Sequence, residues 1–274
     1  MGAARQSCHV GRMAGESDGG STKAQAPPLF ETEVFRAAAG QALRPGGTAL
    51  TGSALDRCTI PVGSRVADVG CGRGATLAML VERGFSALGL DPSAELLAEA
   101  RVALCQAEGD VPKDPAQLAN RADRGIPAGL GRLVRGTAEH IPLTSGSLTA
   151  VTCECVLSVS RDKAQALAEI RRILVPGGVL ILSDLYRRSL SGTSCWPAGC
   201  AAGAVPREEV EALLAGAGFR LHIFEDHSRL LAELAGRLIF AGFPAQSLAA
   251  GCREAGLAGL GRPGYYLCIA YAEE

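Results

Sequence analysis

The most constraining feature of the sequence is a short apolar run that passes into three alternating glycines, Val66-Ala67-Asp68-Val69-Gly70-Cys71-Gly72-Arg73-Gly74. A buried strand that runs into a glycine-rich turn and a helix brings the backbone close to a ligand and points N–H groups toward it. Asp91 closes the next apolar run, where a carboxylate can accept hydrogen bonds from two ribose hydroxyls. The turn and the acid together predict a nucleotide-binding site.

Strand-like and helix-like segments alternate along the chain on either side of this turn. The expected strands are Arg65–Val69, Ala87–Leu90, Leu133–Arg135, Leu148–Cys153, Val179–Ser183, Phe219–Phe224 and Tyr265–Tyr271. Helical patterns such as Ala94–Ala107 and Lys163–Leu174 separate the first five, which predicts βαβ units and a parallel sheet. The last two are joined by a long excursion and predict an antiparallel pair at one sheet edge. We therefore expect a doubly wound, Rossmann-like α/β fold with a seven-stranded, mostly parallel sheet and helices on both faces.

Composition excludes several classes of protein. The formal net charge is -1, so the surface carries no excess positive charge to attract nucleic acid or anionic lipid. No apolar stretch reaches the roughly 18 residues of a membrane span, and residues 1–28 lack the apolar core of a signal peptide. Ten cysteines in such a chain are expected to be reduced, as small core residues or soft ligands. We expect a cytoplasmic protein whose partner is a small molecule, without nucleic-acid or membrane partners.

The chain divides into a leader and one domain. Residues 1–28 are rich in Gly, Ser, Ala and Gln, which predicts a disordered leader. Residues 29–274 then form the domain. Within it, 29–57 are expected to form a helical flap that lies over a site or packs against the core. The polar, Pro-containing stretch 108–132 interrupts the alternation and is expected to be an insertion.

The carboxylate of Asp68 discriminates between nucleotide ligands. It stands two residues before the first glycine, where it would repel a pyrophosphate but attract an ammonium group. S-adenosylmethionine carries an ammonium group and a ribose and has no phosphate, so electrostatics favour it over NAD. The glycines at 70, 72 and 74 also depart from the Gly-x-Gly-x-x-Gly spacing of dinucleotide-binding turns. An NAD(P)-linked oxidoreductase and a non-catalytic cofactor-binding module stay open as alternatives.

These motifs resemble those of the class I S-adenosylmethionine-dependent methyltransferases, in particular the type 11 methyltransferase domain. Asp68-x-Gly70-x-Gly72-x-Gly74 resembles their first motif, and Asp91 their ribose-binding acid. Gly136–Leu143 resembles the segment that contacts adenine, with Thr137 where the family usually has Asp, and Leu174–Val179 resembles the Pro-Gly-Gly turn before their fifth strand. The resemblance implies an enzyme that transfers methyl groups. The cofactor-binding residues it implies are Asp68, Gly70, Cys71, Gly72, Gly74, Asp91, Pro92, Thr137, Ala138 and Glu139.

The end of the fourth strand is where the methyl acceptor is expected. The methyl group of a sulfonium is electrophilic, so the enzyme must position an unprotonated nucleophile near the carboxyl end of that strand. The sequence there reads Cys153-Glu154-Cys155. Strand alternation predicts that Cys153 and Cys155 share one face and that Glu154 lies on the other. Glu154 is either a solvated strand end or a catalytic group that orients the substrate or acts as a base.

The stretch Cys153–Phe219 is more particularly similar to the arsenite methyltransferases. Cys155-Val156 and Asp162-Lys163 match pairs that follow their fourth strand, and Ser183-Asp184-Leu185-Tyr186 matches the end of their fifth. Cys200, which precedes a Gly-Ala turn, matches their second cysteine. The resemblance implies that Cys155 and Cys200 bind trivalent arsenic, for which thiolates are suitably soft ligands.

The acceptor stays open in two respects. The arsenite enzymes carry a further cysteine just beyond the glycine turn, whereas Ala75–Val81 contains none. Cys155 and Cys200 are therefore either ligands or small packing residues, and the acceptor is either an arsenical or a small metabolite without a metalloid. Cys195 and Cys200 lack the two further ligands of a zinc site, so no bound metal is expected.

Overall fold

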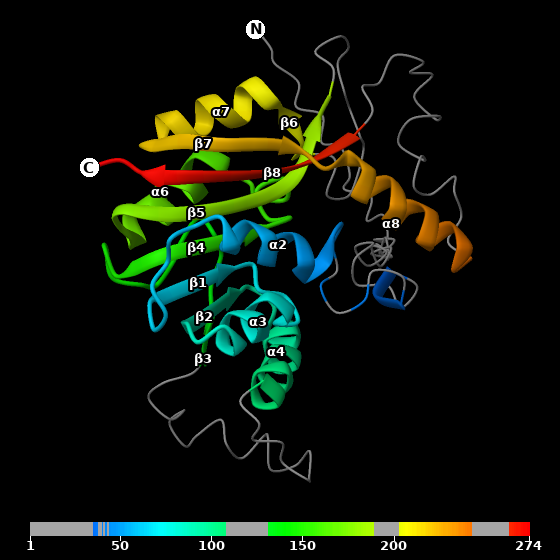
Figure 1. The fold of residues 1–274 in the computed structure, drawn as a ribbon, viewed down its shortest axis with the longest axis horizontal. Helices are drawn as coiled ribbons and strands as arrows, with labels where there is room; N and C mark the ends of the chain where they lie inside the picture. Colours follow the sequence, from blue (N-terminus) through cyan, green and yellow to red (C-terminus); the bar gives the residue numbers. More distant parts are fainter. Residues whose placement is uncertain are drawn as a thin grey trace, which may run out of the picture.

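The computed structural model describes residues 35–37, 40, 42, 44–107, 131–188, 203–242 and 263–274. In chain order the elements are α2 (Gly47–Asp56), β1 (Arg65–Val69), α3 (Ala75–Glu82), β2 (Ser86–Asp91), α4 (Ala94–Ala107), β3 (Gly131–Arg135), β4 (Leu148–Glu154), α6 (Lys163–Ile173), β5 (Leu174–Arg187), β6 (Val205–Pro206), α7 (Arg207–Gly216), β7 (Phe219–Asp226), α8 (Ser228–Phe240) and β8 (Pro263–Ala272). They form a single sheet flanked by helices (Figure 1).

The strands follow one another across the sheet in the order β3-β2-β1-β4-β5-β8-β7, and the short β6 pairs with β5. The strands β1 to β5 are mutually parallel, whereas β8 is antiparallel to both β5 and β7. The doubly wound α/β fold with an antiparallel pair at one edge is thereby confirmed. The carboxyl ends of β1, β2 and β4 meet at one sheet edge, which is where ligands bind in such folds.

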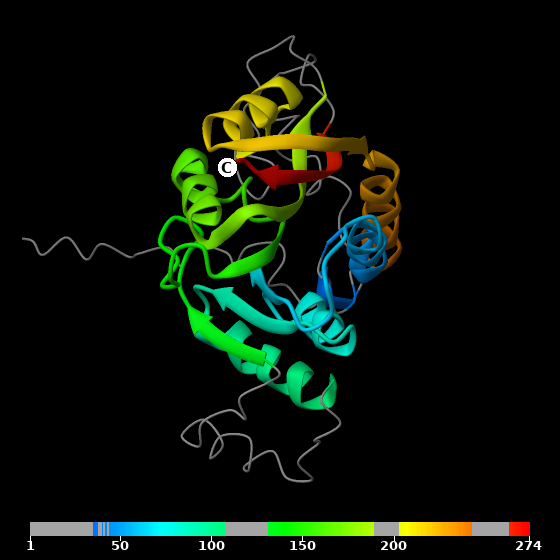
Figure 2. The same cartoon turned by 60° about the vertical axis from the view of Figure 1, so that its left-hand side comes forward.

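Two clusters of buried side chains cover the two faces of the sheet. The α2/α3 core includes Leu55 of α2, Leu77 and Leu80 of α3 and, on the strands, Val66 and Ile181. The α6/α7 core includes Ala67, Val69, Val151, Leu167, Ile170, Leu182 and Leu214. Figure 2 shows α6 and α7 on one face and α2 and α8 on the other. Because side chains alternate along a strand, Asp68 lies on the same face as Val66, toward α2 and α3.

Most predicted elements lie where the sequence places them, and two differ. Strand β5 begins at Leu174, which pairs with Leu148, so the Pro-Gly-Gly segment expected before the strand lies within it. It also extends past Ser183 to Arg187 because its ladder with β8 continues from Val179 to Arg187. The two-residue β6 was not predicted, and it pairs with the same extension, at Tyr186 and Arg187. The leader, most of the predicted insertion and Cys200 lie outside the described residues, so these expectations stay predictions. Among the helices that the structure describes, none has the length and hydropathy of a membrane span.

Candidate cofactor and acceptor site

The glycine turn after β1 needs all three of its glycines for conformation. Gly70, Gly72 and Gly74 have positive φ angles of 76°, 50° and 81°, which side chains rarely allow. A Cβ on Gly70 would lie 2.2 Å from Cγ2 of Val156, and one on Gly74 would lie 2.9 Å from the Cα of Ala100. A Cβ on Gly72 would meet no atom within 4 Å. The outer glycines are therefore packed, and the middle one borders open space in which a ligand can approach the backbone.

Asp91, at the end of β2, is held against this turn. One carboxylate oxygen accepts a hydrogen bond of 2.9 Å from the N–H of Gly72, and the other accepts one of 2.9 Å from the N–H of Ser93. Burial raises the pKa of Asp91, and the hydrogen bonds from the two N–H groups offset only part of this rise. The N–H of Gly136 bonds to the carbonyl of Asp91 at 3.2 Å, so the predicted adenine segment begins beside the predicted ribose acid.

Asp68 is buried at the end of β1. Its Oδ1 accepts a hydrogen bond of 2.8 Å from the hydroxyl of Thr152, its partner in the β1–β4 register. Burial is the largest cause that raises the pKa of Asp68, and the nearby carboxylate of Glu154 is the second; the pKa is about 7. A cationic partner stabilises the charged form of such a buried carboxylate and lowers its pKa.

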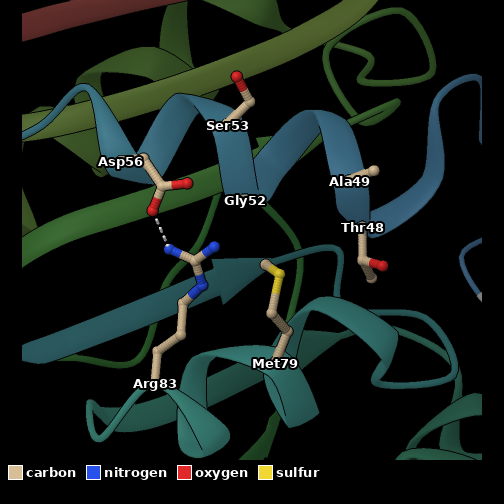
Figure 3. Close-up of a pocket in the computed structure, with 7 residues that line it drawn as sticks. All are labelled: Thr48, Ala49, Gly52, Ser53, Asp56, Met79 and Arg83. Atoms are coloured by element: carbon tan, nitrogen blue, oxygen red, sulfur yellow. Dashed lines mark hydrogen bonds and ion pairs between the residues drawn. The ribbon is translucent and has the colours of Figure 1, made fainter.

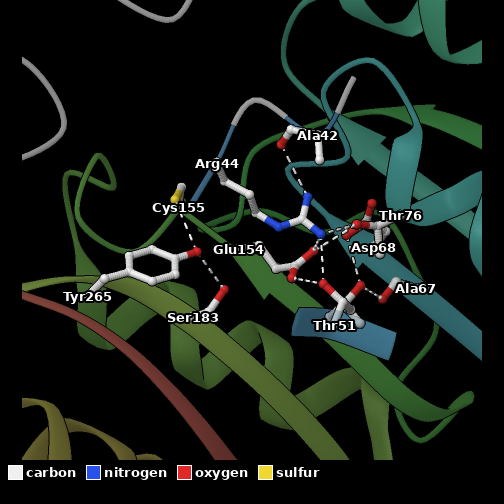
Figure 4. A network of polar contacts seen from close by, with 11 residues as sticks. Ala42, Arg44, Thr51, Ala67, Asp68, Thr76, Glu154, Cys155, Ser183 and Tyr265 are labelled. Atoms are coloured by element: carbon white, nitrogen blue, oxygen red, sulfur yellow. Dashed lines mark hydrogen bonds and ion pairs between the residues drawn. The ribbon is translucent and has the colours of Figure 1, made fainter. Parts of the chain in front are cut away.

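A buried ion pair joins four segments at this edge (Figure 4). Nη2 of Arg44 lies 2.8 Å from Oε2 of Glu154 and donates to the hydroxyls of Thr51 and Thr76, both at 2.7 Å. Both threonines in turn donate to the Glu154 carboxylate. Arg44 precedes α2, Thr51 is on α2, Thr76 is on α3 and Glu154 ends β4. The ion pair therefore fastens the segment before α2 over the carboxyl ends of β1 and β4.

Glu154 is not a solvated strand end. Its side chain is 4% exposed, and both of its oxygens are engaged by Thr51, Thr76 and Arg44. Arg44 was not predicted as a site residue because the run Arg44-Pro45-Gly46-Gly47 indicates only the end of a helix. A charged residue beside a helix break carries no local signal that names a partner on a distant strand.

The backbone turns out of the strand at Cys155. In the described ranges it is the one non-glycine residue with a positive φ, 56°, and its N–H donates to the carbonyl of Ser183 at 2.8 Å. Cys153 is buried in the α6/α7 core, whereas Cys155 packs against the α2/α3 core. The expectation that the two cysteines share a face is wrong, because β4 ends at Glu154 and the alternation stops there. Cys155 lies instead on the face of Glu154.

Residues 67–182 match the family model for the methyltransferase domain. The chain contains a class I, S-adenosylmethionine-dependent methyltransferase domain. The matched residues run from β1 into β5 and include the glycine turn, Asp91, the predicted adenine segment and Cys155. Arg44 lies before the matched part, and Cys200 lies after it.

Relatives of the methyltransferase domain support this assignment. The chain is 35% identical over 130 residues to an arsenite methyltransferase of Aquipseudomonas alcaligenes, covering 45% of this chain and 33% of that protein. It is 33% identical over 138 residues to an uncharacterized methyltransferase of Bacillus subtilis (strain 168), covering 50% of each. The chain thus spans a third to a half of the length of these relatives.

A solved structure shares the fold of the methyltransferase domain. The geranyl diphosphate C-methyltransferase of Streptomyces coelicolor A3(2), crystallised with geranyl diphosphate and S-adenosylhomocysteine, has a TM-score of 0.64 and 17% identity. The similarity covers 82% of this chain and 78% of that one. At this level of identity the comparison shows a common fold.

Within the methyltransferase domain, the predicted adenine segment contacts the loop after β4. Partial burial raises the pKa of Glu139, but hydrogen bonds from the hydroxyl of Ser160 at 2.6 Å and the N–H of Arg161 at 3.0 Å lower it to about 2. Glu139 is therefore ionised and ties this loop to the segment. Thr137 is exposed and Ala138 is buried, and their contacts with adenine stay predictions.

Cys71 packs beneath the turn. Its side chain is buried, and a Cβ added to Gly89 of β2 would lie 2.8 Å from its sulfur. Burial raises the pKa of the Cys71 thiol, so the sulfur stays protonated. Pro92, next to the predicted ribose acid Asp91, is exposed, and its carbonyl accepts a hydrogen bond of 3.0 Å from Arg135.

A groove of about 420 Å³ lies between α2 and α3, away from the turn (Figure 3). Its lining residues are Thr48, Ala49, Gly52, Ser53, Asp56, Met79 and Arg83. Arg83 and Asp56 form an ion pair of 2.6 Å across the end of the groove where both helices finish. Because the glycine turn precedes the start of α3, whereas Met79 and Arg83 lie toward its end, this groove is separate from the predicted cofactor site. The part of the chain that the structure describes contains no cluster of His, Cys, Asp and Glu placed to hold a metal ion.

Proposed function

We propose that the chain transfers a methyl group from S-adenosylmethionine to a small molecule, and that the acceptor is a soft one, such as a trivalent arsenical, held by the thiol of Cys155. One observation carries the proposal. Cys155 lies beyond the end of β4 on the face that also holds Asp68, Glu154 and the start of α3. A nucleophile presented there would meet a methyl group carried by a cofactor seated on the glycine turn.

The residues at the turn fit the cofactor. The backbone of Gly72 borders open space, Asp91 can accept from ribose hydroxyls, and Asp68 offers a carboxylate to an ammonium group. When bound, the cofactor supplies an electrophilic methyl group on a sulfonium. The chain supplies alignment, burial and charge, and these are the main sources of rate in such a displacement.

Cys155 supplies the ligand chemistry in this proposal. Its thiolate binds trivalent arsenic and leaves the arsenic lone pair available for attack. That lone pair forms the new bond to carbon, while the electron pair of the broken carbon–sulfur bond stays on the cofactor's sulfur. Arsenic is thereby oxidised from the trivalent to the pentavalent state. Cys200 is proposed as the second thiol ligand from the resemblance alone, since it lies outside the described residues.

Glu154 has a structural part in this proposal. Both of its oxygens are hydrogen-bonded and the charge of Arg44 balances its own, which disfavours a role as general base. We propose that Glu154 instead anchors the segment before α2 over the cofactor site. The missing cysteine in α3 favours a second candidate acceptor, a small metabolite without a metalloid.

Two measurements test the proposal. Calorimetry with S-adenosylhomocysteine is expected to show binding to the purified chain, and no binding would overturn the cofactor assignment. Transfer of a labelled methyl group is then measured with arsenite plus a thiol and, separately, with a panel of small phenols, amines and carboxylic acids. Product from the panel but not from arsenite would assign the second candidate.

The matched variants are Cys155→Ser and Cys58→Ser. Cys58 is also partly buried, but it follows the end of α2, its thiol donates to the carbonyl of Ala54 at 3.2 Å, and a hydroxyl can make the same bond. We expect Cys155→Ser to lose transfer to arsenic and Cys58→Ser to keep it. Full activity of Cys155→Ser would refute the thiol-bound acceptor.

A further inference from the structure

The hydroxyl of Tyr265 stands between two side chains at the acceptor site. It lies 3.0 Å from Oγ of Ser183 and 3.6 Å from the sulfur of Cys155 (Figure 4). Tyr265 is wholly buried, and its ring packs in the α2/α3 core. A buried tyrosine hydroxyl keeps its hydrogen-bonding partners, so these two contacts fix the direction of the side chain.

Ser183 holds Cys155 in two ways. Its carbonyl accepts the N–H of Cys155 at 2.8 Å, which secures the left-handed backbone at that residue. Its side-chain hydroxyl bonds to Tyr265, which in turn contacts the thiol. Strand β5 therefore fixes the backbone of Cys155, and β5 and β8 together fix its sulfur. Neither Ser183 nor Tyr265 was singled out as an acceptor-site residue by sequence analysis, since one contact crosses from the middle of the chain to its last strand.

We propose that Tyr265 is a positioning residue of the acceptor site: its hydroxyl receives a hydrogen bond from Ser183, donates one to the sulfur of Cys155 and stabilises the thiolate that binds the acceptor. The inference rests on the proposed role of Cys155. A hydroxyl has one hydrogen to donate, so donation to the sulfur requires that Ser183 donates to the tyrosine oxygen. When the thiolate forms, the thiol proton leaves to solvent and the tyrosine keeps its own.

The charged groups near the sulfur do not replace a neutral hydrogen-bond donor such as the Tyr265 hydroxyl. Two charged groups, Arg44 before α2 and Glu154 at the end of β4, act on the hydroxyl of Tyr265 with opposite signs. These two groups form an ion pair of 2.8 Å, so the charge of one offsets part of the effect of the other on Tyr265. Burial raises the pKa of Tyr265 well above its usual value, so its hydroxyl stays protonated and able to donate near neutral pH. A hydrogen bond to an ionised group is stronger than one between neutral groups.

The experiment is the pH dependence of the alkylation of Cys155 by iodoacetamide, quantified by mass spectrometry of the peptide that carries it. The thiolate displaces iodide and forms a thioether, so the rate against pH reports the fraction of thiolate. For Tyr265→Phe we expect the midpoint to rise by about one pH unit, which makes alkylation roughly tenfold slower below the midpoint. For Ser183→Ala we expect a smaller rise in the same direction.

The control is Tyr266→Phe. Tyr266 is equally buried but faces the α6/α7 core, where it stacks on Phe224 with ring centroids 4.9 Å apart. Its alkylation midpoint is expected to equal that of the unaltered chain. An unchanged midpoint in Tyr265→Phe would overturn the proposal, and if that variant fails to fold, an unchanged midpoint in Ser183→Ala would do so.

This test is independent of methyl transfer. Alkylation needs neither the cofactor nor the acceptor, so a shifted midpoint in Tyr265→Phe stands even if Cys155→Ser keeps full methyltransferase activity. In that case the proposed function fails and the link between tyrosine and thiol holds. An unshifted midpoint together with an inactive Cys155→Ser would mean the reverse: the thiol takes part in transfer, and Tyr265 does not stabilise its thiolate.

Discussion

The guanidinium of Arg44 lies 2.8 Å from the carboxylate of Glu154, with the two side chains only 7% and 4% exposed. This pair connects the chain before α2 to the end of β4, and its neighbours are the hydroxyls of Thr51 and Thr76. The pair therefore holds the segment before α2 against the carboxyl ends of the strands, where Asp68 is buried.

Arg44→Ala is expected to destabilise the chain strongly. Removal of one partner leaves the other charge buried and unpaired, which costs about 3–5 kcal/mol. The control is Arg83→Ala, which breaks an ion pair with Asp56 whose side chains are 34% and 66% exposed, and it is expected to cost less than about 1 kcal/mol. Urea unfolding of both variants measures the difference. Equal losses of unfolding free energy in the two variants would show that the buried pair stabilises the chain no more than the exposed one.

Cofactor affinity is expected to rise with pH through about 7, because Asp68 ionises there and its charged form attracts an ammonium group. Asp68→Asn removes the charge and keeps the shape. We expect this variant to bind S-adenosylhomocysteine about 10- to 100-fold more weakly at pH above 7, since a hydrogen bond to a charged group contributes about 1.5–3 kcal/mol. Calorimetry across this pH range checks the slope, which should be flatter in the variant.

Stability is expected to depend on the same carboxyl in the opposite sense. The pKa of Asp68 is about 7 in the folded chain, above the value of about 4 for an unfolded aspartate. The folded state therefore binds more protons between these values, and the contribution of Asp68 to stability falls as the pH rises from about 4 to about 7. Asp68→Asn has no such titration. The difference in unfolding free energy between the two proteins should therefore change across this window, and a constant difference would contradict the raised pKa.

Gly70→Ala is expected to disrupt the turn, and Gly63→Ala gives the matched comparison. Both glycines have φ near 80°, so each substitution carries roughly 1–2 kcal/mol of backbone strain. A Cβ at Gly63 meets no atom within 4 Å, whereas one at Gly70 lies 2.2 Å from the stiff side chain of Val156. The clash adds about 1–3 kcal/mol. Thermal unfolding should show a larger loss for Gly70→Ala, and Val156→Ala should restore part of it.

The sequence was sufficient for the parts of the site that are local in the chain. A strand, a glycine turn and a helix follow one another within a few residues, so their geometry is determined by neighbours, and Gly70, Gly72 and Gly74 adopt the conformations that only glycine adopts easily. Asp91 could be placed for the same reason, because it ends the next strand of a βαβ unit.

The parts that sequence analysis missed depend on contacts between distant segments. The partner of Glu154 is decided by how α2 packs on α3, which no periodicity encodes. The face of Cys155 was predicted wrongly because alternation was extended one residue past the end of β4. Tyr265 lies on a strand whose pairing with β5 is known only once the sheet is assembled.

The reversed direction of β8 has a consequence for how such a site diverges during evolution. An antiparallel strand brings its first residues, rather than its last, to the edge where the parallel strands end, which is why Tyr265 lies beside Ser183. Substitutions among the first residues of β8 can therefore alter the proposed acceptor site while they leave residues 67–182 untouched. The proposed acceptor site can thereby diverge separately from the glycine turn that we propose holds the methyl donor.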